Sequence, residues 1–255
     1  MFIRLKTAKK KLSAITIEDL KRRLDLFFKI YDSWGFRQKI RTIVSPGGVW
    51  GVPIEELYPL AEEFKGRGLE YWPNGWYPQI TGAHMLMRGV FCMRETGAGV
   101  IPWNAYDYDP DMLLEIAPLA IETGRSVFGA HWPNFLRYNP KRSLEHLDAW
   151  VGYFKRQAEY FGCMLSRDVG FAANQEIHAA YSKVECYHDK CVIDTEGAHL
   201  FGFDNLENTF YISLKKDRVP KACIGGGISL YEEHNEFNTY KIDYNERKLE
   251  LVFGE

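Results

Sequence analysis

The stretch Leu69-Glu70-Tyr71-Trp72-Pro73-Asn74-Gly75-Trp76 decides the expected fold. Its first half favours a β-strand, and its Pro-Asn-Gly turn ends the strand and presents two indoles. A helical pattern over Glu55–Phe64 precedes this strand, and a strand pattern over Ile40–Val44 precedes the helix. The order strand, helix, strand is typical of parallel strands joined by crossover helices, as in a barrel or a doubly wound sheet.

The same order of elements recurs on both sides of this stretch. A helix is expected from Thr16 to Gly35. The segment His84–Arg94 fits either a strand around Phe91 or one short helix, and we favour the strand. The other expected strands are Phe2–Leu5, Val100–Trp103, Ser126–Ala130 and Cys163–Ser166, and the other expected helices are Met112–Ile121 and Ser143–Phe161.

The pattern changes from about Tyr181 onward to an alternation rich in Val and Tyr. No helix of ordinary length fits there, so residues 181–255 are expected to form a small antiparallel β domain after an α/β domain of residues 1–180. Gly225-Gly226-Gly227 precedes a strand, which favours a bulge or a close backbone contact over a phosphate-binding loop. The expected strands are Val184–Tyr187, Cys191–Ile193, Thr209–Leu214, Ile228–Tyr231, Thr239–Tyr244 and Leu249–Phe253, with a hairpin at Asn245-Glu246.

The composition argues against several classes of partner. The 255 residues carry a net charge of -2, and the basic residues are scattered apart from Lys9-Lys10-Lys11, so no nucleic-acid partner is expected. No membrane partner is expected either, because Gly, Pro and Asn interrupt the longest uncharged stretches. Met1-Phe2-Ile3-Arg4 is too short for a signal peptide, so the default location is the cytoplasm, although a removed export signal would leave no trace. The sequence gives no indication of the oligomeric state.

The cysteines do not suggest a disulfide framework. Five is an odd number and they are widely spread, so reduced thiols are expected. Cys186, His188 and Cys191 form a Cys-x-His-x-x-Cys pattern of the kind that zinc sites use. No fourth ligand is evident, and two strands joined by His188-Asp189-Lys190 would explain the pattern without a metal. We therefore expect no cofactor; the alternative is a divalent metal, for which the usual ligands are not seen.

Five of the seven tryptophans lie in short stretches rich in Gly, Pro and Asn, each after an expected strand. The ends of strands build the binding face of an α/β barrel. Indoles displayed there suit the apolar faces of sugar rings, and polar neighbours suit the hydroxyl groups. Trp34 and Trp150 lie in helical patterns and are assigned to the core. The expected saccharide-binding residues are Trp50, Trp72, Asn74, Trp76, Trp103, Asn104, Trp132, Asn134 and Arg167.

The candidates for proton transfer are His131, Asp107, Asp168 and Glu70. His131 follows an expected strand and suits a general acid or a partner of a sugar hydroxyl; the alternative is a loop histidine bonded to backbone. Asp107 would reach a barrel mouth from Trp103-Asn104. Its Asp-Tyr-Asp-Pro-Asp context lacks the later residues of a calcium loop and also fits a helix cap at Asp111.

The other two carboxylates have alternatives of their own. Glu70 shares a strand face with Trp72 and would serve as an acid or base if burial raised its pKa, whereas outward exposure is the commoner fate of a glutamate. Arg167 and Asp168 end the last expected strand of the α/β domain. An ion pair between them would either line the pocket or only close the barrel.

Three stretches between residues 2 and 170 carry a family resemblance. They are Phe2-Ile3-Arg4-Leu5-Lys6-Thr7 with the helix that follows, Phe128-Gly129-Ala130-His131-Trp132 with Asn139-Pro140, and Cys163-Met164-Leu165-Ser166-Arg167-Asp168. Their order resembles the first, a late and the final strand of the polysaccharide deacetylase (chitooligosaccharide deacetylase homology) family. The resemblance implies a distorted (β/α) barrel of about seven strands, here followed by the β domain. It also implies hydrolysis of an N-acetyl or related linkage on a saccharide.

The metal site of that family is not matched in this sequence. Metal-dependent members carry an Asp-Asp pair where this chain has Lys6 and Thr7, and His84 has no histidine four residues on to complete a His-x-x-x-His pair. The chain is then either a carbohydrate-acting hydrolase whose catalytic residues differ from those of the family, or a non-catalytic carbohydrate-binding relative. In the second alternative Lys6 occupies the position at which other members bind the metal. A glycosidase with two carboxylates about 5 to 10 Å apart is a third alternative.

Overall fold

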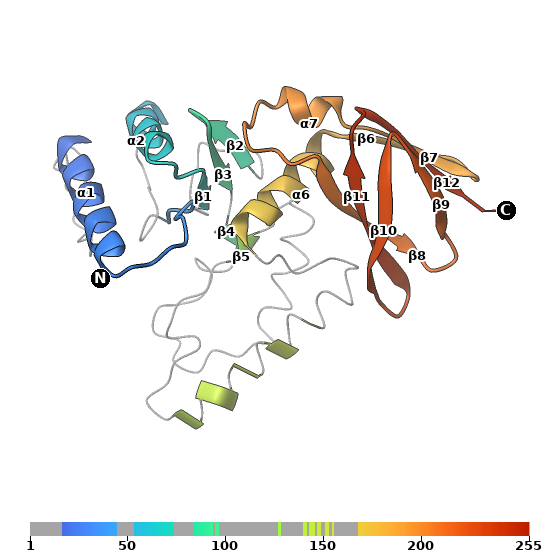
Figure 1. The fold of residues 1–255 in the computed structure, drawn as a ribbon, viewed down its shortest axis with the longest axis horizontal. Coiled ribbons are helices and arrows are strands. Elements are labelled where there is room, and N and C mark those ends of the chain that lie inside the picture. The colour runs from blue at the N-terminus through green and yellow to red at the C-terminus, as the bar shows by residue number, and fades with distance from the viewer. Residues whose placement is uncertain are drawn as a thin grey trace. The chain divides into compact units, whose positions relative to one another are not determined.

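The computed structural model describes residues 17–44, 54–73, 84–93, 95–96, 127–128 and 168–254, together with some helical residues between 140 and 155. The chain divides into two compact units, residues 1–95 and 96–255, and each is described by itself (Figure 1). The domain boundary expected near residue 180 stays a prediction. The elements expected at Phe2–Leu5, Val100–Trp103, Met112–Ile121 and Cys163–Ser166 lie outside the described residues.

Unit 1 contains helix α1 (Ile17–Ser33), as the apolar spacing predicts. Leu24 is buried, and Leu20 and Phe28, which lie four residues before and after it, pack against the same core. Gly35 follows the helix with a φ of +72°, a left-handed conformation that glycine adopts at low cost. The expected end of this helix is therefore confirmed.

A small mixed sheet follows α1 in the sequence of unit 1. Thr42 pairs in parallel with the first residue of β1 (Tyr71–Pro73), and α2 (Ile54–Gly66) lies between them in the chain, as the strand, helix, strand order predicts. β3 (Val90–Met93) is parallel to β1, and β2 (His84–Met87) is antiparallel to β3. The sheet order is β1-β3-β2.

The segment from His84 to Met93 is a hairpin of two strands. Arg88 and Gly89 both have positive φ, +49° and +79°, which is the geometry of a two-residue turn between antiparallel strands. The strand favoured around Phe91 is confirmed as β3, and the alternative of one short helix is wrong. β2 is a further strand that the sequence pattern did not indicate.

The core of unit 1 lies between α2 and the sheet. Leu57, Ala61 and Phe64 of α2 are buried together with Trp72 of β1 and Val90 of β3. Full burial of a large apolar side chain contributes about 1.5–3 kcal/mol. This packing fixes α2 on the sheet.

Unit 2 contains two antiparallel sheets within its described residues. Their strand orders are β6-β7-β12-β9 and β10-β11-β8. Every pairing among these strands is antiparallel, as the alternation after Tyr181 predicts. The elements are α6 (Val169–Tyr181), β6 (Lys183–Cys186), β7 (Lys190–Asp194), α7 (Glu196–Leu200), β8 (Thr209–Lys215), β9 (Pro220–Ile224), β10 (Gly226–Glu233), β11 (Phe237–Tyr244) and β12 (Lys248–Phe253); the short strands β4 (Glu95–Thr96) and β5 (Val127–Phe128) precede them in the chain.

The two sheets of unit 2 share one core. Ile193 and Leu251 of the four-stranded sheet belong to the same buried cluster as Phe210 and Ile242 of the three-stranded sheet. Figure 1 shows these sheets beside each other in the orange and red part of the chain. A Cβ at Gly226 would lie 2.5 Å from a carbonyl oxygen of β11, so the close backbone contact expected at the glycine run is confirmed.

Helix α6 covers the edge of the three-stranded sheet. β8 is an edge strand, and two amide side chains of α6 bond its outward backbone groups. Asn174 accepts from the N–H of Glu207 at 2.9 Å and donates to the carbonyl of Thr209. Gln175 accepts from the N–H of Tyr211 at 2.9 Å and donates to its carbonyl at 3.2 Å. The amides therefore take the place of a neighbouring strand.

The expected (β/α) barrel is wrong. Within the described residues the strands form open sheets of three, four and three strands and one two-stranded pair, β4 with β5, and only α1, α2 and α6 have seven or more residues. A closed barrel needs every strand to pair with neighbours on both sides. Here β2 joins β3 through a tight turn without a crossover helix and ends its sheet.

Candidate functional site

Most residues of the expected saccharide site lie outside the described part of the chain, and their roles stay predictions. Glu70, Trp72 and Asp168 are described, and each takes part in the packing or capping of its own unit. The undescribed candidates are Trp50, Asn74, Trp76, Trp103, Asn104, Asp107, His131, Trp132, Asn134 and Arg167.

Trp72 is a core residue of unit 1. Its side chain has no exposed surface, and its indole meets the ring of Phe64 edge-on with the centroids 5.0 Å apart. A sugar ring needs an exposed aromatic face. The expectation that Trp72 displays its indole to a ligand is therefore corrected.

Glu70 is buried, with 7% of its surface exposed, and cations balance its charge. One carboxylate oxygen bonds the guanidinium of Arg41, and the Nζ of Lys39 lies 3.9 Å from the other oxygen. The backbone N–H of Glu70 also donates to the carbonyl of Arg41 at 2.7 Å. This ion pair fastens the segment around Thr42 to β1, and both carboxylate oxygens have a structural role.

Asp168 is the N-cap of α6. Its Oδ1 accepts the backbone N–H of Phe171 at 2.8 Å, and its backbone is extended, as in most N-caps. The ion pair expected between Arg167 and Asp168 stays a prediction, because Arg167 lies outside the described residues. The carboxylate satisfies an N–H group at the start of the helix.

An exposed group of rings lies at the C-terminal end of α1, and we call it the α1 aromatic cluster. It consists of Phe27, Tyr31, Trp34 and Phe36. Tyr31 lies between Phe27 and Phe36, with centroid distances of 6.2 and 4.9 Å, and Trp34 meets Phe36 at 5.9 Å. Trp34 is 70% exposed, Phe36 55% and Phe27 47%. Trp34 was assigned to the core, and that assignment is wrong.

The cluster is held in place by local bonds at the helix end. The hydroxyl of Tyr31 donates to the carbonyl of Gln38 at 2.9 Å, which folds the chain back beside α1. Trp34 lies one residue beyond the last residue of the helix. The helical spacing of apolar residues therefore does not predict which way its side chain faces. The signal available in the sequence was the position of Trp34 directly before Gly35, at the expected helix end.

A groove lined by four charged residues and one phenylalanine borders this cluster. Its volume is about 550 Å³, and it is open to solvent. Arg67 is fixed there by Asp25 at 2.7 Å and by Glu63 at 2.6 Å. Phe28 lines the groove and its ring contacts Phe27 at 5.4 Å, so the groove and the aromatic cluster are contiguous. The lining residues are Asp25, Phe28, Lys29, Asp32 and Arg67.

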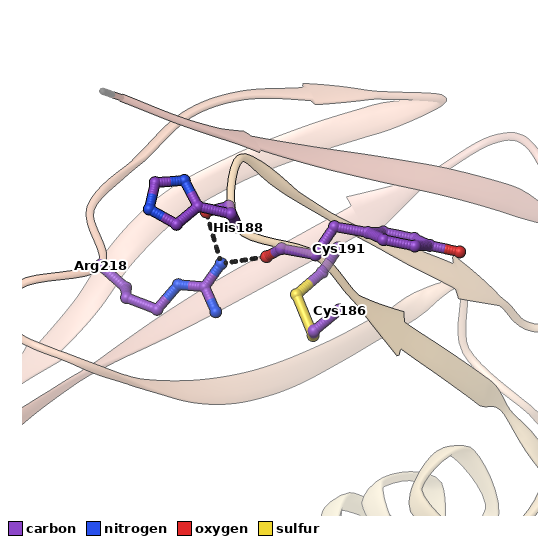
Figure 2. Close-up of a disulfide and its surroundings, with 5 residues drawn as sticks. Cys186, His188, Cys191 and Arg218 are labelled. Carbon is purple, nitrogen blue, oxygen red and sulfur yellow. Dashed lines mark hydrogen bonds between the residues drawn. A yellow bond between two sulfur atoms is a disulfide. The ribbon is translucent and has the colours of Figure 1, made fainter.

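Unit 2 carries a disulfide between Cys186 and Cys191, at facing positions of β6 and β7 (Figure 2). The expectation of reduced thiols is therefore corrected for this pair. The two strands expected on either side of this pattern are present: β6 ends at Cys186, β7 begins at Lys190, and residues 187–189 join them. Within the described residues no group of His, Cys, Asp and Glu is arranged to hold a metal ion.

Arg218 holds the turn of this hairpin. Its guanidinium donates to the carbonyls of Tyr187 and His188 at 2.9 and 3.3 Å, as Figure 2 shows. The same group lies 4.2 Å from the centre of the Phe253 ring, a cation–π contact. The turn therefore has anchors that do not depend on the sulfur–sulfur bond.

A cluster of titratable side chains surrounds His199 in unit 2. Its Nε2 lies within hydrogen-bond distance of the hydroxyl of Tyr244, at 2.7 Å, and also contacts the guanidinium of Arg247. His178 packs beside it, with ring centroids 6.4 Å apart, and donates from Nε2 to the carbonyl of Glu207 at 3.0 Å. Burial lowers the pKa of both histidines, and Arg247 lowers that of His199 further. With Nε2 of His199 already bonded, the cluster serves as a hydrogen-bond network of the fold.

Comparison of the chain with protein-family models, with curated proteins and with solved structures gave no match. Among the described helices, none is both long enough and apolar enough to cross a bilayer.

Proposed function

We propose that the protein binds a saccharide on unit 1, at the α1 aromatic cluster and the groove beside it. The observation that carries this proposal is the exposure of Trp34 and Phe36 within a continuous set of rings. Contiguous exposed apolar surface on a folded protein marks an interaction site more often than chance. The roles expected for Trp50, Trp76, Trp103 and Trp132 stay predictions.

The chemistry of the two neighbouring surfaces suits a sugar. The C–H groups of a pyranose pack against aromatic faces such as that of Trp34. Its hydroxyls bond the carboxylate of Asp32 and the ammonium of Lys29, which line the groove. A volume of about 550 Å³ lies within the range of small-ligand sites.

Binding is better supported than hydrolysis. The resemblance to polysaccharide deacetylases implies cleavage of an N-acetyl or related linkage, and His131 and Asp107 stay candidates for it. Glu70 is committed to Arg41 and Asp168 to a helix cap, so neither supports proton transfer or the glycosidase alternative. We therefore put forward carbohydrate binding, in place of hydrolysis, as the function.

A glycan array tests the proposal with a matched pair of variants. Trp34→Ala removes the most exposed ring of the cluster, whereas Leu26→Ala removes an apolar side chain of α1 that is 52% exposed and outside the cluster. We expect Trp34→Ala to weaken the glycan signal at least about tenfold, and Leu26→Ala to leave it unchanged. An unchanged signal for Trp34→Ala, or no bound glycan for the wild type, contradicts the proposal.

A second assay separates binding from hydrolysis. Acetate release from N-acetylated oligosaccharides is measured for the wild type and for His131→Ala. We expect neither protein to release acetate. Release by the wild type that is lost in His131→Ala would replace the binding function with the hydrolase that the resemblance implies.

We also propose that the protein works in an oxidising compartment, in place of the cytoplasm expected by default. The bond between Cys186 and Cys191 supports this, because disulfides persist in such compartments. Alkylation of free thiols before cell extraction, followed by peptide mass spectrometry, tests it. Recovery of both cysteines in alkylated form would favour the cytoplasm.

A further inference from the structure

The two sulfurs of the hairpin disulfide lie in different surroundings. Cys186 is on β6, an edge strand whose four residues are all exposed. Cys191 is on β7 and is 3% exposed, within the core cluster that includes Leu251 and Phe253. An external reagent therefore reaches Cys186 and is excluded from Cys191.

This asymmetry decides which sulfur an external thiol attacks. In thiol–disulfide exchange a thiolate approaches one sulfur along the line of the bond, and the other sulfur leaves. An approach to Cys186 comes from the open side of the edge strand. An approach to Cys191 would pass through the core between the two sheets.

The turn keeps its shape when the bond opens. Arg218 bonds the carbonyls of Tyr187 and His188, and the N–H of Phe253 donates to the carbonyl of Asp189 at 2.8 Å. The N–H of Tyr187 also donates to the carbonyl of Lys190 at 2.7 Å. These bonds hold the released thiol of Cys191 next to Cys186, so the reverse attack is intramolecular and fast.

We propose that Cys186 is a site of reversible modification by small thiols such as the tripeptide glutathione. The glutathione thiolate attacks Sγ of Cys186 and forms a mixed disulfide with it. The bond to Cys191 breaks, and Sγ of Cys191 leaves with the electron pair and takes a proton from water. Attack by the Cys191 thiolate on Cys186 reverses the step and expels glutathione, so no other oxidant or reductant is needed.

The first test compares two variants that both lack the disulfide. Cys191→Ser leaves Cys186 as a thiol, and Cys186→Ser leaves Cys191. Each is treated with oxidised glutathione, and modification is followed by peptide mass spectrometry, with Cys223 as a reference thiol common to both. We expect Cys186 to react at least about tenfold faster than Cys191, and the difference to vanish in urea. Equal rates in buffer, or a faster Cys191, count against the proposal.

The second test uses the wild type and so does not depend on how the variants fold. The protein is treated with reduced glutathione, quenched with acid at early times and digested. We expect glutathione on Cys186 and a free thiol at Cys191. Glutathione on Cys191 with a free thiol at Cys186 overturns the proposal, as does a digest with no glutathione on Cys186 at any time.

Discussion

His178 lies inside unit 2 as a neutral ring, with its Nε2–H bonded to the carbonyl of Glu207. Burial lowers its pKa below the ordinary value of 6.5, so the unfolded chain binds this proton more readily than the folded chain. The free energy of unfolding is therefore highest above pH 6.5. It falls as the pH decreases, by at most about 1.4 kcal/mol per pH unit for one histidine.

We expect the urea midpoint of the wild type to decrease between about pH 7.5 and about pH 5.5, where carboxylates contribute little. His178→Gln keeps a donor for Glu207 but does not titrate, so its midpoint should decrease less. His199 lies against Arg247, and its pKa is also lowered, so it contributes to the pH dependence with the same sign. Identical slopes for the two proteins would show that His178 titrates as in the unfolded chain.

The two described tryptophans differ in how much they contribute to stability. Trp72→Ala empties a fully buried site beside Phe64, and we expect it to lower the free energy of unfolding by about 3–5 kcal/mol. Trp34→Ala removes a ring that is mostly in solvent, and its effect should stay within about 0.5 kcal/mol. Thermal and urea unfolding of both variants check this. Comparable losses would mean that Trp34 is covered in solution.

Some residue roles follow from local pattern and others do not. The end of α1 at Gly35 was predictable because glycine adopts positive φ. The partner of Glu70 was not, because Arg41 lies 29 positions earlier in the chain. Alternation also gives the side of the strand on which Trp72 lies, but not whether α2 covers that side.

At the scale of elements, breaking the contact of α6 with β8 should lower the free energy of unfolding by a measurable amount. Asn174 is buried, and Asn174→Ala leaves the N–H of Glu207 and the carbonyl of Thr209 without this partner. We expect a loss of about 1–3 kcal/mol in the free energy of unfolding. Gln175→Ala is the matched variant and should cost less, because Gln175 is half-exposed and water can replace its amide. A larger loss for Gln175→Ala would contradict this ranking.

The β6–β7 hairpin should lose little stability when its disulfide is reduced. The bond closes a loop with a sequence separation of only 5, and the chain-entropy relation then gives about 2 kcal/mol. The bonds from Arg218 already close the turn, so we expect a smaller loss. Urea unfolding with and without a reductant measures it, with Cys186→Ser as a control that should not respond. A loss well above about 2 kcal/mol would mean that the bond supports more than this hairpin.

Elements with strong periodicity were predictable, and elements with weak periodicity were not. The strands after Tyr181 were expected at β6, β7, β8, β10, β11 and β12, since each alternates between buried and exposed positions or carries Val and Tyr. Helix α6 was missed because Ala172 and Ala173 on its buried side give little apolar contrast. β9 begins at Pro220, a residue that usually counts against a strand.

At the scale of the whole molecule, the order of elements did not determine how strands pair. Strand, helix, strand order correctly predicts the parallel pairing of Thr42 with β1. It does not show that the chain returns through Arg88 and Gly89 to place β2 at the edge of the sheet. Closure of a barrel depends on such non-local pairings, and the candidate site on α1 depends on which side of a helix stays uncovered.

Binding of a saccharide should stabilise the whole protein. A ligand present at about 100 times its dissociation constant adds about 2.7 kcal/mol to the free energy of unfolding. We expect a glycan selected on the array to raise the melting temperature of the wild type and of Leu26→Ala, but not that of Trp34→Ala. An equal increase in all three proteins would place the glycan away from the α1 aromatic cluster.

The side-chain amides of α6 that bond β8 also affect whether copies of this chain associate through this strand. If heat or a protease displaces α6, the outward N–H and C=O groups of Glu207, Thr209 and Tyr211 become available to any extended peptide, including a strand from a second copy. Pairing of a strand from a second copy with β8 then competes with rebinding of α6 to the same backbone groups. The attachment of a single helix thus protects the protein against self-association at this edge.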